Sequence, residues 1–157
     1  MTVPAYPLAV AWAAGVIDGE GCITITRQAP GTDGRVNPSH RLYLKVSMGH
    51  YETIRRLQSI FQRGAITRQP GGQWNDAWVW WVAQRQAGEV LHEVRPHLVT
   101  KAAEADLALE FLAIPRHTQG GPGGTRPLAP ETVAARETMF ARLRDAKPSA
   151  RFRQPTC

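Results

Sequence analysis

The sequence contains few cysteines and no cysteine motif. Only Cys22 and Cys157 occur among 157 residues, and they form neither a CxxC pair nor a set of zinc ligands. This pattern excludes a disulfide framework and a cysteine-based structural zinc site. A reducing, cytoplasmic compartment is therefore expected, whether near a nucleoid or inside an organelle.

No hydrophobic run is long enough to cross a bilayer. The longest apolar stretch, residues 7–17, carries no charged side chain. It is shorter than the roughly 20 residues that a spanning helix needs, and no basic leader precedes it. We expect this stretch to lie in a protein core, and we expect no membrane partner.

Acidic residues are outnumbered by basic ones. Lysine and arginine total 19 against 13 aspartates and glutamates, which gives a formal charge of +6. Such a balance favours a polyanionic partner, although ribosomal, membrane-surface and nucleic-acid-binding proteins share it. The hydrophobic content of 43% suffices for one core.

Composition changes along the chain predict its organisation. We expect a core domain at residues 1–115, followed by a linker rich in glycine and proline at 116–130. A helix is predicted at 131–146 and a basic, disordered tail at 147–157.

Two carboxylates follow the apolar N-terminal stretch directly. Residues 13–21 read A-A-G-V-I-D-G-E-G, so a helix over 7–17 is expected to end at Gly19 and Gly21. A helix C-terminus carries partial negative charge, so Asp18 and Glu20 there favour a bound cation. The alternative is an ordinary turn with solvated carboxylates.

This segment resembles the LAGLIDADG motif of homing endonucleases. The resemblance implies an α+β fold in which an antiparallel β-sheet saddle is covered on one face by helices, with one motif per chain. Residues 90–101, V-L-H-E-V-R-P-H-L-V-T-K, followed by Ala105, are similar to the segment before the last core helix of small single-motif members. The family's active-site lysine would then be Lys101.

Alternating residues predict a hairpin after the motif. Strands are expected at 22–27 and 41–46, with Ile23, Ile25, Leu42, Leu44 and Val46 inward. The opposite face would present donors suited to phosphates and base edges, or else a merely solvated surface. The predicted DNA-binding residues of this hairpin are Thr24, Thr26, Gln28, Arg41, Tyr43 and Lys45.

A second hairpin is expected at 65–68 and 76–84, with helices at 51–61, 87–94 and 101–112. Trp78, Trp80 and Trp81 lie in its return strand, and aromatic residues at this density favour a place in the core over base stacking, which is the alternative. Arg68 and the turn residue Trp74 are the predicted DNA contacts here.

The resemblance implies metal-assisted phosphodiester hydrolysis. Glu20, with the backbone carbonyl of Gly19, would hold Mg²⁺, for which Mn²⁺ can substitute, and Lys101 would steady developing charge. With one motif copy and no internal repeat, a homodimer on a pseudo-palindromic double-stranded DNA target is implied. Asp18, Gly15 and Ala11 would form the helix end and the dimer contact.

One residue departs from the family pattern. Met48 stands where these enzymes commonly place a polar residue near the scissile phosphate, and Ser47 and His50 are the nearby polar substitutes. A site-specific endonuclease therefore competes with a non-cleaving nucleic-acid-binding protein, either an RNA-binding intron maturase or a DNA-binding regulator. A basic interaction protein without a nucleic-acid role is the third alternative.

Overall fold

The fold alternates helices with antiparallel hairpins. A computed structural model describes residues 6–31, 37–73, 75–115 and 128–147. Its elements are, in order, α1 (Tyr6–Glu20), β1 (Gly21–Gln28), β2 (Ser39–Met48), α2 (Tyr51–Phe61), β3 (Ala65–Gln69), β4 (Ala77–Ala83), α3 (Gln84–Val94), the 3-10 turn η1 (Arg95–His97), α4 (Ala102–Ala113) and α5 (Pro130–Asp145).

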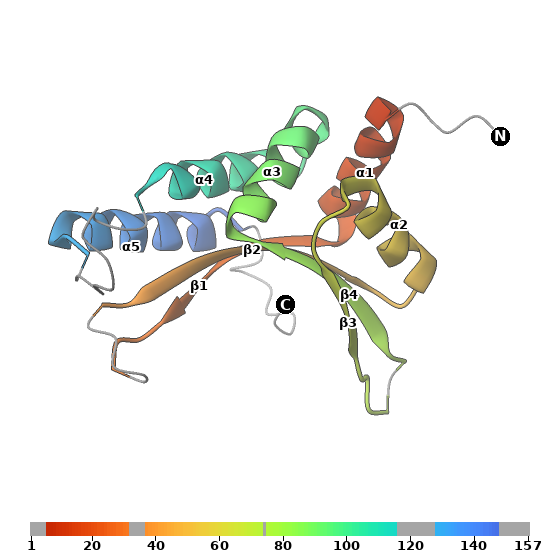
Figure 1. Ribbon diagram of the computed structural model, residues 1–157, viewed down its shortest axis with the longest axis horizontal. Helices are drawn as coiled ribbons and strands as arrows, with labels where there is room; N and C mark the ends of the chain where they lie inside the picture. Colours follow the sequence, from red (N-terminus) through yellow and green to blue (C-terminus); the bar gives the residue numbers. More distant parts are fainter. Residues whose placement is uncertain (1–5, 32–36, 74, 116–127, 148–157) are drawn as a thin grey trace.

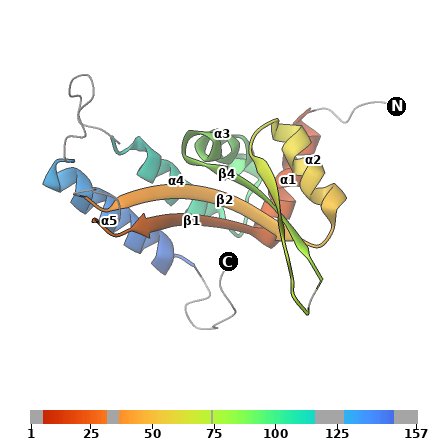
Figure 2. The same cartoon turned by 60° about the horizontal axis from the view of Figure 1, so that its bottom comes forward.

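The four strands form one antiparallel sheet with the order β1-β2-β4-β3. The sheet curves, and the described helices lie on its convex side, with α5 along the β1 edge (Figures 1 and 2). The predicted α+β saddle covered on one face by helices is therefore confirmed. The opposite, concave side is called the free face below.

Alternation along the strands assigns each side chain to a face. In β2 the even-numbered residues from His40 to Val46 are buried beneath the helices, whereas Arg41, Tyr43, Lys45 and Ser47 are exposed or half-buried. Directly paired residues of antiparallel strands share a face, so the register extends this assignment across the sheet. The predicted inward positions Ile23, Ile25, Leu42, Leu44 and Val46 are all buried.

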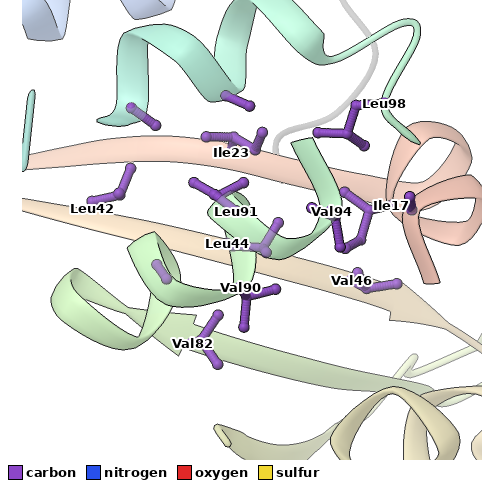
Figure 3. Close-up of a cluster of buried hydrophobic side chains, with 14 of the residues drawn as sticks. Ile17, Ile23, Leu42, Leu44, Val46, Val82, Val90, Leu91, Val94 and Leu98 are labelled. Carbon is purple, nitrogen blue, oxygen red and sulfur yellow. The ribbon is translucent and has the colours of Figure 1, made fainter. Parts of the chain in front are cut away.

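The core lies between the sheet and the helices. Side chains of α3, among them Val90, Leu91 and Val94, pack on Leu44 and Ile23 (Figure 3). Trp80 is fully buried and its ring stacks on Phe61 at 5.6 Å. A continuous core of this kind fixes the curvature of the strands and the position of the N-terminal helix.

Some predicted boundaries shift. The helix expected over 7–17 continues to Glu20, so Gly19 lies inside α1 instead of ending it. Helix α3 begins at Gln84 instead of Ala87, and α5 begins at Pro130, inside the predicted linker. Most of that linker and nearly all of the predicted basic tail lie outside the described residues.

Helix α5 is anchored to the sheet by a buried histidine and its neighbours. His40 is 3% exposed, and its Nε2 lies 3.5 Å from Glu137 Oε2, while neither ring nitrogen has a hydrogen-bond partner within the described residues. Arg27 Nε donates to Glu137 Oε1 at 2.7 Å, and Arg136 donates to the His40 carbonyl at 3.0 Å. Burial lowers the pKa of His40 below 6.5, which Glu137 offsets only in part.

We expect this histidine to make the protein acid-sensitive. Because its folded-state pKa lies below the unfolded value of 6.5, the unfolded chain binds the proton first, and stability falls as pH drops from about 6.5 toward the folded pKa. Urea unfolding at pH 7.5 and pH 5.5 should give a smaller difference for His40→Gln than for wild type. His92→Gln, at an exposed histidine, is the control and should retain the wild-type difference.

Candidate metal and nucleic-acid site

The junction of α1 and β1 holds the candidate metal-binding carboxylate. Glu20 is the last residue of α1, is exposed, and makes no hydrogen bond or ion pair within the described residues. A Cβ on Gly21 would lie 2.4 Å from the Ile17 carbonyl oxygen, so only glycine permits this tight passage from helix to strand. Glu20 thus projects from a helix end where its charge is unfavourable without a cation.

Asp18 ties α1 to the segment before α4. Its carboxylate accepts the backbone N–H of Val99 at 2.7 Å and that of Lys101 at 3.0 Å. Burial raises the pKa of Asp18, but these backbone N–H groups and Thr100 outweigh it, and the pKa is lowered overall. Asp18 is therefore committed to the protein backbone, and it places Lys101 beside the end of α1.

We expect removal of this tie to destabilise the fold. Asp18→Ala leaves two backbone donors without their charged acceptor, at a cost of about 1–3 kcal/mol in the free energy of unfolding. Since the folded pKa is depressed, this contribution is present above pH 3.8 and is lost as pH falls through the folded value. Urea unfolding should show a gap between variant and wild type at pH 7 that narrows in acid. An unchanged midpoint at pH 7 would contradict the assignment.

Lys101 precedes α4 and is half-buried. It makes no ion pair in the part of the chain that the structure describes. Glu104, one turn further along, is 7% exposed; burial raises its pKa, which the charges of Lys101 and Lys147 oppose. The backbone of Lys101 is held by Asp18 of α1, and its ammonium acts electrostatically on Glu104.

The predicted DNA-binding residues of the first hairpin share the free face. The register pairs Thr24 with Tyr43 and Thr26 with Arg41, while Gln28 pairs with Ser39 and Lys45 with Cys22. Lys45 Nζ lies 5.0 Å from the centre of the Tyr43 ring. The structure thus brings together all six residues on one concave, largely polar surface.

The second hairpin differs from the prediction. Arg68 pairs with Trp78 by register, which places it on the face opposite to Thr24 and Tyr43, and its guanidinium binds the Asp76 carboxylate. Its neighbours Thr67 and Gln69 occupy the free face instead. Arg68 is therefore not grouped with the other predicted contacts, and Trp74 lies outside the described residues.

The prediction that all three tryptophans lie in the core is wrong for Trp81. Trp80 is buried and Trp78 packs against the core, but Trp81 is half-buried on the free face, 6.1 Å from the Tyr43 ring. Neighbouring residues of a strand point to opposite faces, so a buried Trp80 places Trp81 on the free face. This alternation is the sequence signal for Trp81. Thr67 and Gln69 are the other free-face residues that the sequence reading missed.

The comparison of Met48 with a polar active-site residue also needs correction. Met48 lies on the helix-covered side of β2 and packs against the core. Ser47 is the exposed free-face residue at this strand end, and His50 caps α2 by accepting the Thr53 N–H at 3.3 Å. The presence of methionine at position 48 is therefore no argument against catalysis on the free face.

Helix α1 leaves one side uncovered. Gly15 is exposed and a Cβ added there would meet no atom within 4 Å. Ala11 lies one turn before it and is half-buried, and Leu8, one further turn away, is 66% exposed. This side is apolar, narrow and open to a second backbone.

Two features of the described residues bear on what the chain can bind. Their His, Cys, Asp and Glu side chains form no group of three or more that could hold a metal ion. A cation at Glu20 would thus need oxygen ligands from outside this set. None of the described helices has the length and apolar character that crossing a membrane requires.

The sequence matches no known protein family, whereas the fold matches solved structures. No family model matches the sequence, and no curated protein does. Among solved structures, the homing endonuclease I-CvuI in complex with a DNA target has a TM-score of 0.77 at 19% identity, covering 95% of this chain and 87% of that one. The archaeal intron-encoded homing endonuclease I-Vdi141I, complexed with DNA, has a TM-score of 0.70 at 13% identity, covering 94% and 89%.

A third neighbour, the homing endonuclease I-TnaI, has a TM-score of 0.59 at 15% identity over 87% of this chain and 94% of that one. Identities this low speak to architecture alone. The helix-covered antiparallel sheet and these neighbours, together with the motif at residues 13–21, show that the chain has the fold of the LAGLIDADG homing endonucleases.

Proposed function

We propose that this chain is a site-specific double-strand DNA endonuclease, a homing endonuclease that acts as a homodimer on a pseudo-palindromic target. The observation that carries the proposal is the uncommitted Glu20 carboxylate at the end of α1, the helix whose Asp18 binds the backbone of Lys101. The neighbours I-CvuI and I-Vdi141I are complexed with DNA, and I-CvuI was solved with Mg and with Ca, which supports a duplex partner and a divalent ion.

The residues at the junction fit a hard cation. Glu20 would supply a carboxylate and Gly19 a backbone carbonyl, and oxygen ligands of this kind suit Mg²⁺. When bound, the ion lowers the pKa of its water and stabilises the leaving oxygen. Lys101 then offsets negative charge on the phosphate, and the free face holds the duplex in register.

The content of one chain supports a homodimer. Each chain contributes a single exposed carboxylate at the motif, which is half of what a symmetric cut of two strands needs. The open side of α1 around Gly15 and Ala11 allows two copies to pack closely, and this would bring both Glu20 side chains together. Asp18 stays with its own chain and braces the helix end.

The endonuclease is favoured over the non-cleaving alternatives. The argument for a maturase or a regulator came from Met48, and that side chain faces the core. The polar groups Ser47 and His50 remain near the strand end on accessible surface. The site therefore retains its acidic, basic and polar members.

Cleavage of a randomised target library tests this function. Purified protein and Mg²⁺ are incubated with supercoiled plasmids that carry a randomised insert, and the ends of linear products are sequenced. We expect cuts at one pseudo-palindromic sequence, abolished by EDTA and restored by Mg²⁺ or Mn²⁺. Binding without linear product under all ion conditions would reject the nuclease, and ends without two-fold symmetry would reject the homodimer.

A further inference from the structure

The free face is apolar along one central strand. Ala77, Val79, Trp81 and Ala83 occupy consecutive free-face positions of β4, and all are half-buried. Their neighbours Trp80 and Val82 point to the core and are fully buried. Strand β4 is therefore apolar on both faces, although helices cover only one. We call Ala77, Val79, Trp81 and Ala83 the β4 strip.

The free face of β1 and β2, on one side of the strip, differs in character. In β1 and β2 the free face carries Thr24, Thr26, Gln28, Arg41 and Lys45, as expected for a strand with one solvated side. Trp81 pairs directly with Lys45, and its ring lies 6.1 Å from that of Tyr43. A cationic and hydrogen-bonding region on β1 and β2 thus adjoins the apolar β4 strip on the same concave surface, and Thr67 and Gln69 of β3 lie on the other side of the strip.

The β4 strip and the cationic residues of β2 lie on one continuous surface, so a partner that binds one also contacts the other. Arg41 and Lys45 suit a polyanion, and one rigid duplex that lies against β1 and β2 also meets β4, because adjacent strands are about 4.8 Å apart. The major groove offers one apolar group to such a surface, the 5-methyl group of thymine. An apolar strip beside charged donors is thus complementary to a groove edge rich in A·T pairs.

We propose that the β4 strip contacts thymine methyl groups, so that each half-site of the target carries A·T pairs opposite Val79, Trp81 and Ala83. The proposal rests on the proposed function, since it assumes a bound duplex, and it adds the base preference. Free-face positions along a strand are about 7 Å apart, close to two base steps of about 3.4 Å. The preferred thymines are therefore spaced by about two pairs.

Replacement of thymine by uracil isolates the methyl group. Duplexes that bind best are selected from a random pool in Ca²⁺, each thymine is replaced singly by uracil, and affinity is measured by fluorescence anisotropy. We expect about a fourfold loss for each methyl removed opposite the strip, from about 0.8 kcal/mol per buried carbon group. Uracil at thymines opposite the charged donors Arg41 and Lys45 should change little.

Variants connect the effect to the strip. Trp81→Ala should abolish the difference between thymine and uracil at one position, and Val79→Thr, which keeps the shape of the side chain, should reduce it at another. Arg41→Ala is the control, because it should weaken binding of both duplexes equally and leave their ratio unchanged. Thermal unfolding confirms that each variant is folded.

The outcomes separate the two proposals. Site-specific binding in which uracil is tolerated at every position overturns this inference alone, and it would mean that the strip is covered by something other than thymine. Failure to bind any duplex overturns this inference together with the proposed function. A position-specific uracil effect that disappears in Trp81→Ala supports it.

Discussion

Replacement of Glu20 by glutamine is expected to abolish DNA cleavage and to leave DNA binding largely intact. The amide preserves the shape of the side chain but removes the negative charge that would hold Mg²⁺, so the loss in rate should be at least about 10²–10³-fold. Glu20 is exposed and makes no hydrogen bond or ion pair within the described residues, so folding should be unaffected. The measurements are the rate of linear product formation and the affinity for the same duplex in Ca²⁺.

Glu131→Gln is the matched control for this substitution. Glu131 is an exposed carboxylate in the first turn of α5, on another element, and the same chemical change there should leave the rate at the wild-type level. If Glu20→Gln cleaves DNA at the wild-type rate, Glu20 is not a ligand of the metal ion. Equal loss of binding and cleavage would mean that Glu20 acts in assembly or DNA contact instead of catalysis.

Local patterns explain why much of the fold could be predicted. The alternation of Ile23 and Ile25 with threonines predicts both the strand and its buried face. When only one face of a sheet is covered, the apolar residues of an alternating strand must point to that face. The long apolar helix before the motif was equally clear. Its end was misplaced, since Gly19 reads as a helix breaker, whereas Asp18 holds the last turn through the backbone of Val99 and Lys101. That tie joins segments 81 residues apart and has no local signal.

The sequence predicted the site residues that belong to the motif. It predicted less well the residues whose place on the free face depends on the register of strand pairing. Residues 65–69 contain one large apolar side chain, Ile66, and a shift of one position there exchanges Arg68 for Thr67 on the free face. In β4, residues of both faces are apolar, so the sequence shows no polar and apolar alternation that would assign Trp80 and Trp81 to opposite faces. Met48 faces the core because β2 continues to Met48 and keeps the alternation of Leu44 and Val46, whereas the predicted strand ended at Val46.

Replacement of Gly15 by leucine is expected to separate folding from assembly. An added Cβ at Gly15 meets no atom within 4 Å in the single chain, and leucine is the better helix former by about 0.8 kcal/mol, so the chain should be as stable as wild type or slightly more so. The larger side chain would prevent close approach of two α1 helices. Sedimentation should then show a monomer, and linear cleavage product should be lost with it.

Ala134→Leu provides the comparison for this change. Ala134 is exposed in α5, so a similar increase in volume there tests the effect of surface leucine without touching α1. It should leave both the sedimentation coefficient and the cleavage rate unchanged. A Gly15→Leu protein that stays dimeric and active would place the interface elsewhere, and then the two Glu20 carboxylates would not converge. A protein that unfolds instead would contradict the open space around Gly15.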